Sequence, residues 1–340
     1  ARLLVNTAGF DHNEFVLGSD IMRFLPKMVY HLDEPIGDPA AINTYLMCFH
    51  ARENGSKVIL SGMGADELFF GYRRHKAFMI AQKYRALPSF IRKIIWNVVT
   101  LLPVKIGGRG LRLIRWSKKF LSIAEQSNSE SYRMSYSYYS EEDLKKLFLK
   151  NVDEEIVEVK TEHEEVFNSV SGSVQNRICN TDVHYFMQGL NLTYTDRSSM
   201  AASVEVRVPF VDRCVIETAM TSDGNQKFTD GTLKYTLKKA AESILPKNII
   251  HRPKASFGAP IRSWISKDLV DTIDDILSLE SITKRGIFNP IYVRGMIEAD
   301  RAGQADYAYQ IYHILSIEIW FRIFIDRDSS YDNILLISPE

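Results

Sequence analysis

The residues best suited to chemistry form a glycine-interrupted loop, Ser61–Gly64, which follows the apolar run Val58–Leu60. Glycines let backbone amides approach a phosphate closely, and a loop between a strand and a helix is a common anion site. Asp66 beside this loop would repel phosphate unless a divalent cation lies between them. The pattern therefore indicates a Mg²⁺-bridged nucleotide or pyrophosphate. The alternative is an ordinary turn in which Asp66 and Glu67 only complement the helix dipole, and a short glycine motif alone does not separate the two.

A second candidate is the basic segment that contains Arg252 and Lys254. Pro253 stiffens the chain just before the lysine. A rigid loop that presents two cations suits charge neutralisation on a transferring phosphoryl group. A solvated basic loop is the simpler interpretation of this pair taken alone.

A third polar cluster begins at Asp196 and Arg197 and continues through Glu205, Arg207 and Asp212. Its later charges alternate with valines, which is typical of a half-buried strand with one solvated face. An ion-pair network that shapes a pocket floor is equally consistent with the pattern. We expect a structural or pocket-shaping role for these residues before a catalytic one.

Asp38 lies in an acidic turn just before an expected helix that begins at Ala40. Its carboxylate is well placed to cap that helix. The alternative is a contact with substrate or metal at the end of a strand.

Composition restricts the partners. The chain has 340 residues, 45% of them hydrophobic, and its 42 Lys and Arg balance 42 Asp and Glu. A net charge of zero argues against a bulk nucleic-acid binder, which normally has a basic excess, but leaves room for a local basic site. The apolar run 94–104 is too short to span a bilayer, and we expect no membrane partner. We interpret the run as a core or dimer-contact helix, with a surface-lying helix as the alternative. Three scattered cysteines and the absence of a secretory pattern in residues 1–5 predict a cytoplasmic protein.

The expected elements divide the chain into three parts. Residues 1–75 are predicted to form a partial α/β nucleotide-binding portion, with strands at 15–17 and 58–60, the latter buried, and helices at 21–31 and 40–54. Residues 76–180 are predicted to be a helical insertion without strands, with a loop at 127–131 and a helix from 141. Residues 181–340 are predicted to be mainly helical, with polar loops at 195–212 and 250–260. Alternating strands and helices favour a parallel sheet with ligands at the carboxyl ends of its strands.

Four of these segments together resemble the synthetase domain of glutamine-hydrolysing asparagine synthetases, which belong to the pyrophosphatase-loop ATP family. Their order and approximate spacing match over nearly the whole chain. The segments are Leu32–Pro35 with Asp38–Pro39, Ser61–Glu67 with Gly71–Tyr72, Asp196–Met200 with Glu205–Asp212, and Arg252–Lys254 with Phe257–Gly258.

The resemblance implies an α/β fold with an incomplete parallel sheet of the adenine-nucleotide pyrophosphatase-loop type, followed by a mainly α-helical portion. It implies that the aspartate side chain attacks the α-phosphorus of ATP, that pyrophosphate leaves, and that ammonia displaces AMP from an aspartyl-adenylate. The roles that it implies are ATP and pyrophosphate binding by Ser61, Gly62, Gly64, Asp66, Arg197 and Lys254, Mg²⁺ binding by Asp66, catalysis by Lys254, and a substrate pocket with Asp38, Asp196, Glu205 and Arg207. A homodimer is compatible with it.

Three departures from the family pattern qualify this expectation. The family's signature Ser-Gly-Gly-x-Asp-Ser is absent, and its expected place is upstream of residue 1. The glutaminase domain with its N-terminal cysteine is absent as well. We therefore expect ammonia to come from a domain outside this chain and the 340-residue piece alone to be nearly inactive. Met63 stands where the family has an acid, and losing such an acid lowers a rate by about 10²- to 10⁴-fold. Glu67 or Glu34 could compensate.

Two other functions follow from these departures. A change at Met63 is compatible with an AMP-forming amidotransferase or lactam-forming synthetase that uses another acceptor. A degenerate, non-catalytic nucleotide-binding module is the second alternative.

Overall fold

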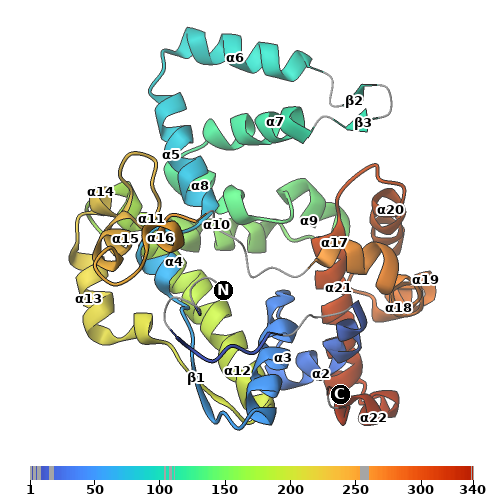
Figure 1. Ribbon diagram of the computed structural model, residues 1–340. Helices are drawn as coiled ribbons and strands as arrows, with labels where there is room; N and C mark the ends of the chain where they lie inside the picture. The colour runs from blue at the N-terminus through green and yellow to red at the C-terminus, as the bar shows by residue number, and fades with distance from the viewer. Residues whose placement is uncertain are drawn as a thin grey trace.

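The computed structural model describes residues 2, 5, 9–14, 19–102, 105–106, 109–110, 112–252, 260–337 and 339. Over these residues the protein is mainly helical, with one small parallel sheet and one small antiparallel sheet. The predicted strand at 15–17 and Lys254 lie outside the described residues. Figure 1 shows a helical body from which a pair of helices, α6 and α7, projects at the top of the view.

The parallel sheet consists of β1 (Val58–Leu60) and β4 (Glu205–Arg207), with Ile59 opposite Val206. The amide of Ser61 donates to the Arg207 carbonyl at 2.8 Å, so the pairing reaches the first residue of the glycine loop. Because parallel strands end at the same edge of a sheet, the segments that follow β1 and β4 lie side by side. The strand predicted at 58–60 is confirmed.

The prediction that this strand is buried is wrong. Val58 and Leu60 are 43% and 73% exposed. Only the face with Ile59 and Val206 packs against the core, because side chains alternate between the two faces of a strand.

The helices before β1 agree with prediction. They are η1 (Ser19–Phe24), α2 (Leu25–Leu32) and α3 (Ala40–Glu53). Leu25, Met28, Val29 and Leu32 recur at helical spacing and are buried. The amide of Ala40 donates to Asp38 Oδ1 at 2.9 Å, which confirms the predicted cap.

The middle of the chain is helical, with one correction to its boundaries. Its elements are α4 (Ala65–Leu68), α5 (Arg73–Arg85), α6 (Ser89–Leu101), β2 (Lys105–Ile106), β3 (Arg109–Gly110), α7 (Arg112–Ala124), α8 (Asn128–Tyr136), α9 (Glu141–Leu147), α10 (Asp153–Asn168) and α11 (Val174–Asp182). The loop predicted at 127–131 is wrong. Ser127 instead caps α8 by accepting from the Glu130 amide at 3.3 Å, and the run of small polar residues is a helix start.

Two other expectations for this region also fail. The segment has a short hairpin of β2 and β3, whose two-residue strands are too short to show alternation in sequence. The run 94–104 was predicted to be a core or dimer-contact helix, but α6 has no buried residue. A fully buried helix is therefore excluded, although Ile95 and Val99 pack against a small core, and a dimer contact stays a prediction.

The last part of the chain contains a long unbroken helical run and a helical C-terminal body. Its elements are η2 (Val183–Leu192), α12 (Thr193–Ala201), η3 (Pro209–Val211), α13 (Arg213–Thr221), α14 (Gly224–Lys227), α15 (Tyr235–Ala241), α16 (Lys247–Ile250), α17 (Ile261–Ser263), η4 (Trp264–Asp268), α18 (Val270–Ile276), α19 (Leu279–Arg285), α20 (Pro290–Arg301), α21 (Ala308–Trp320), η5 (Phe321–Ile325), η6 (Ser329–Tyr331) and α22 (Asp332–Leu335).

The long run joins α11, η2 and α12 without a break, and η2 is a π-helix. Residues 196–200 therefore belong to a helix and not to the predicted polar loop, because α12 packs against α2 and α3 and buries Ser198 and Ser199 of this turn. The main core surrounds α21, where Ile311, Tyr312, Ile314, Leu315 and Ile319 are buried.

The division at 1–75, 76–180 and 181–340 stays a prediction. The first and third parts contribute one strand each to the parallel sheet. Among the described residues, no helix is long and apolar enough to cross a membrane.

Candidate active site

One large cavity, of about 1270 Å³, opens at the carboxyl edge of β1 and β4. Its main walls are Pro35 with residues 37–40, the glycine loop, the segment from α4 to α5, residues 135–139, η2, α12 and α21. Of the residues to which the sequence analysis assigns a site role, six line this cavity: Asp38, Ser61, Gly62, Met63, Gly64 and Asp66. Glu67, considered there as a substitute for the missing acid, lines it too. The structure thus brings the glycine loop, its acid and Asp38 together.

The glycine loop has the backbone that its sequence requires. Gly64 has φ +88°, and a Cβ there would lie 2.8 Å from Cγ2 of Val211, so no other residue fits without a shift. A Cβ at Gly62 would meet nothing within 4 Å, which leaves open space beside the loop. The amide of Met63 donates to Ser61 Oγ at 3.3 Å and holds the turn.

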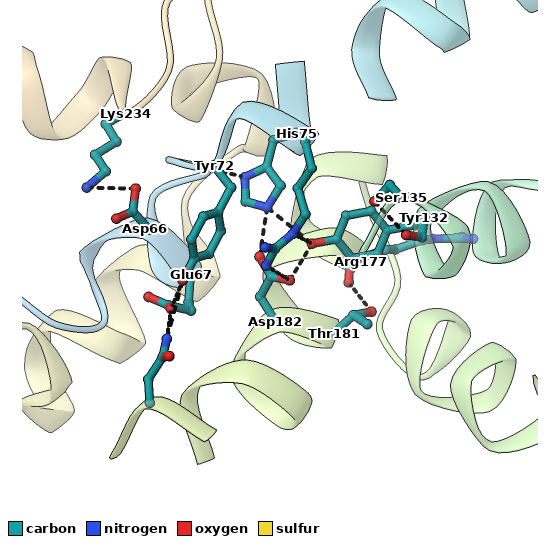
Figure 2. Close-up of polar contacts among 12 residues, drawn as sticks. Asp66, Glu67, Tyr72, His75, Tyr132, Ser135, Arg177, Thr181, Asp182 and Lys234 are labelled. Atoms are coloured by element: carbon teal, nitrogen blue, oxygen red, sulfur yellow. Dashed lines mark hydrogen bonds and ion pairs between the residues drawn. The ribbon is translucent and has the colours of Figure 1, made fainter. Parts of the chain in front are cut away.

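Asp66 is paired with Lys234, a residue that the sequence analysis did not select. Lys234 Nζ lies 3.0 Å from Asp66 Oδ1, and Figure 2 shows the two side chains facing each other. Lys234 follows Asp66 by more than 160 residues, and no motif connects them. Within the described residues, no three acidic, imidazole or thiol groups gather as a metal site. One carboxylate is nevertheless compatible with Mg²⁺, which is commonly held by one or two carboxylates together with substrate phosphates.

Gly71 provides the space for this pair. A Cβ at residue 71 would come within 2.9 Å of the Asp66 Cα and would also collide with the Asp66 carboxylate and the Lys234 side chain. The Gly71 amide donates to the Asp66 carbonyl at 2.8 Å. The backbone atom in this clash cannot rotate away, so the turn itself would have to move.

We expect Gly71→Ala to displace Asp66 and weaken nucleotide binding by about tenfold or more, since one strong charge-assisted contact contributes about 1.5–3 kcal/mol. Titration of the complete polypeptide with ATP and Mg²⁺ measures the effect. Gly189→Ala is the control, because a Cβ there meets nothing within 4 Å. Equal ATP affinity in the two variants would contradict the assigned role of this turn.

Glu67 forms a wall of the cavity and is 1% exposed. The Tyr72 hydroxyl donates to it, and Asn191 Nδ2 donates to Glu67 Oε1 at 2.6 Å. Burial raises the pKa of Glu67, although the hydrogen bond from Tyr72 opposes this shift. The π-helix η2 places Asn191 here, and wide helical turns of this kind often occur at functional sites.

A buried network lies directly behind Tyr72 (Figure 2). The Tyr72 amide donates to His75 Nδ1 at 3.3 Å, so the ring proton is on Nε2, which donates to Asp182 Oδ2 at 2.7 Å. Arg74 Nη2 donates to Asp182 Oδ1 at 3.0 Å, and the Tyr132 hydroxyl donates to the same oxygen. Burial would raise the pKa of Asp182, but the adjacent Arg74 and His75 outweigh it and hold the pKa low.

We expect Asp182→Asn to lower the free energy of unfolding by about 3–5 kcal/mol, because it leaves the Arg74 cation buried without its counter-ion. The low folded pKa means that this stabilisation is complete above the unfolded value of about 3.9 and is lost as the pH falls through the folded value. Urea denaturation at pH 7 and at acidic pH measures both effects. Exposed Asp271→Asn is the control, and equal stability of the two variants would contradict the network's role.

Met63 stands at the position where the resemblance implies an acid. Its side chain lines the cavity, and the Thr195 hydroxyl contacts Met63 Sδ at 3.0 Å. A thioether accepts hydrogen bonds only weakly and takes no proton at neutral pH. The cavity therefore has an apolar group at this point.

The Asp38 end of the cavity is aromatic. Tyr138 and Tyr309 stack with ring centroids 4.9 Å apart, and His313 packs edge-on against Tyr138. Burial raises the pKa of Asp38 and lowers the pKa of His313 to about 4. At neutral pH, His313 is therefore uncharged.

Other predicted site residues do not line the cavity. Glu205 and Arg207 point to solvent and pair with each other at 2.8 Å, while Val206 between them lines the cavity. The alternation of charge and valine was thus a strand with one solvated face. Asp196 is exposed, and Arg197 forms an exposed ion pair with Asp33.

The comparisons with known proteins agree with the motifs. The chain belongs to the asparagine synthase family, whose sequence model, described as Asparagine synthase, matches residues 1–322. The resemblance inferred from the four motifs is therefore confirmed.

Several curated relatives support this result. Asparagine synthetase [glutamine-hydrolyzing] 1 of Bacillus subtilis is 33% identical over 308 residues, which are 91% of this chain and 47% of the relative. A Mycobacterium bovis protein is 28% identical over 313 residues, 92% of this chain and 46% of the relative. The Gallus gallus asparagine synthetase [glutamine-hydrolyzing] is 31% identical over 127 residues, 33% of this chain and 23% of the relative. The chain spans about half the length of the first two.

Proposed function

We propose that the complete protein catalyses ATP-dependent, AMP-forming amide synthesis, with aspartate as acceptor and asparagine as product. The aspartate carboxylate attacks the α-phosphorus of ATP, the bond to pyrophosphate breaks, and ammonia then displaces AMP from the aspartyl-adenylate. The observation that carries this proposal is the convergence of the glycine loop, Asp66 and Asp38 in one cavity of a chain from the asparagine synthase family.

The cavity residues divide into phosphate and substrate roles. Ser61, Gly62 and Gly64 would contact the phosphates, and Asp66 would hold Mg²⁺, which screens phosphate charge when bound. Lys234 would then leave Asp66 and contact a phosphate. Asp38 would face the acceptor. Two further phosphate contacts remain predictions, namely Lys254 and Arg197. A position near the substrate remains a prediction for Asp196, Glu205 and Arg207.

The rest of the complete protein would supply the remaining parts of the site. The names of these relatives describe them as glutamine-hydrolysing, so we propose that a glutaminase domain outside this chain delivers the ammonia. A signature loop on a further strand would complete a sheet of the pyrophosphatase-loop type. A cytoplasmic homodimer is compatible with this arrangement.

A second candidate is AMP-forming amide or lactam synthesis on another acceptor. The observation that favours it is the apolar and aromatic lining formed by Met63, Tyr138 and Tyr309. Aspartate has two carboxylates, and an aromatic surface contributes no positive charge to bind them.

The first test follows AMP formation by the complete polypeptide with ATP, Mg²⁺, aspartate and ammonia. We expect aspartate-dependent AMP, and Asp66→Asn should reduce its rate by about 100-fold or more because charge stabilisation in the site is lost. Exposed Asp271→Asn should not. Turnover with another carboxylic acid while aspartate is inert would replace the leading proposal by the second. ATP binding without any turnover would indicate a non-catalytic module.

The second test concerns Met63. We expect Met63→Glu in the complete polypeptide to raise the rate of AMP formation, up to about 100-fold, because it restores a proton acceptor at this position. Met63→Gln is the matched control, since it has the size and polarity of glutamate without its basicity. If the two variants had equal rates, the base would have to lie elsewhere.

A further inference from the structure

Residues 86–124, here called the basic arm, are the most unevenly charged part of the chain. This segment has no Asp or Glu. It has eight basic residues: Arg92, Lys93, Lys105, Arg109, Arg112, Arg115, Lys118 and Lys119. Arg92 pairs with Glu125, the first residue beyond the segment, and Lys119 lines the active-site cavity. Because the whole chain has a net charge of zero, the remaining positive charge is balanced elsewhere in the sequence.

The basic arm projects from the body. It comprises α6, the β2–β3 hairpin and α7, and Figure 1 shows α6 as the outermost helix, with α7 between it and the body. The inner side of α6 is held by packing, since Ile95 and Val99 contact the small core around Tyr84, Leu121 and Ala124. Lys118 Nζ also donates to the Thr100 carbonyl at 2.8 Å. The outer side of α6 is therefore fixed in orientation.

That outer side is an apolar stripe. Phe90, Ile94, Val98 and Leu101 are spaced four, four and three residues apart, which places them on one face of the helix. Their exposed fractions are 64%, 59%, 55% and 83%. Lys93 is also exposed and lies at the edge of the stripe, 60° from Phe90 at 100° per residue. Isolated exposed apolar residues are common, but a full helix face of them marks a contact surface.

We propose that the basic arm docks on an anionic membrane surface, with α6 lying in the interface. Aliphatic and aromatic side chains on one face, with cations beside them, are the pattern of helices that lie in the headgroup region. Lys and Arg near anionic lipids add an attraction that salt screens. Helix α6 has 13 residues, too few to span a bilayer, so it would lie on the surface.

The charge argues against two other occupants. A symmetric contact between two copies through this face would oppose two acid-free, positively charged segments, which repel each other. The phosphates of a nucleic acid would pair with the cations, but the aliphatic stripe would remain exposed to water. The proposal revises the expectation of no membrane partner, and it does not depend on the proposed function.

Flotation of the complete protein with phosphatidylcholine vesicles, with and without phosphatidylglycerol, tests the proposal. We expect binding to the anionic vesicles only, with release at high salt. Leu101→Asp should lower partitioning more than about tenfold. It removes an apolar side chain that would be buried in the bound state, and it adds a negative charge that anionic lipids repel. Lys93→Gln should lower it about fivefold.

Matched controls keep the result specific to the arm. Ile291→Asp alters an equally exposed apolar residue of α20, 78% exposed, and Lys267→Gln alters an exposed lysine of η4. Both should bind vesicles like the parent, and all four variants should keep its midpoint of thermal unfolding. The proposal is overturned if the complete protein does not float, if it binds both vesicle types equally, or if Leu101→Asp and Ile291→Asp behave alike. Loss of self-association in Leu101→Asp without vesicle binding would assign the stripe to a second copy.

Discussion

The buried carboxylate of Asp182 is the constraint on which the cavity wall depends. It ends α11 and accepts hydrogen bonds from Arg74 and His75 of α5 and from Tyr132 of α8. A buried carboxylate is costly unless such donors surround it, so moving any one of these three helices away from Asp182 would be penalised. His75 also accepts a hydrogen bond from the Tyr72 amide, and the Tyr72 hydroxyl donates to Glu67. The helix α5 that carries the arm is thereby fixed to the active-site wall.

The sequence predicted well what depends on neighbours in the chain. The strand at 58–60, the helices at 21–31 and 40–54, and the cap by Asp38 follow from apolar spacing and local hydrogen bonding, and all are present. The four motifs in order identified the family. Ser127 shows the limit of local inference, because a small polar run can form a loop or begin a helix. Packing of the turn that follows decides between the two.

The residues that sequence analysis missed are joined by contacts between distant segments. Lys234 reaches Asp66, and Asn191 reaches Glu67, across more than a hundred residues. No spacing rule connects such pairs in a single sequence. The same limit applies to α6, since its apolar run was visible in the sequence, but the sequence could not show which side of the helix packs. Val58 and Leu60 were misjudged for this reason too.

The position of Met63 leaves the question of which acid could accept a proton in the cavity. Glu34 is exposed and does not line it. Glu67 lines it, but its carboxylate already accepts from Tyr72 and Asn191, and protonation would weaken both contacts that hold the wall. Asp66 has the charge that a phosphate-bound cation needs. Asp38 accepts from the Ala40 amide, and burial raises its pKa, but burial also raises the pKa of Glu67, so the direction of the shift does not distinguish the two. Their contacts do, since the bond that Asp38 accepts caps a helix, whereas the bonds that Glu67 accepts hold the cavity wall.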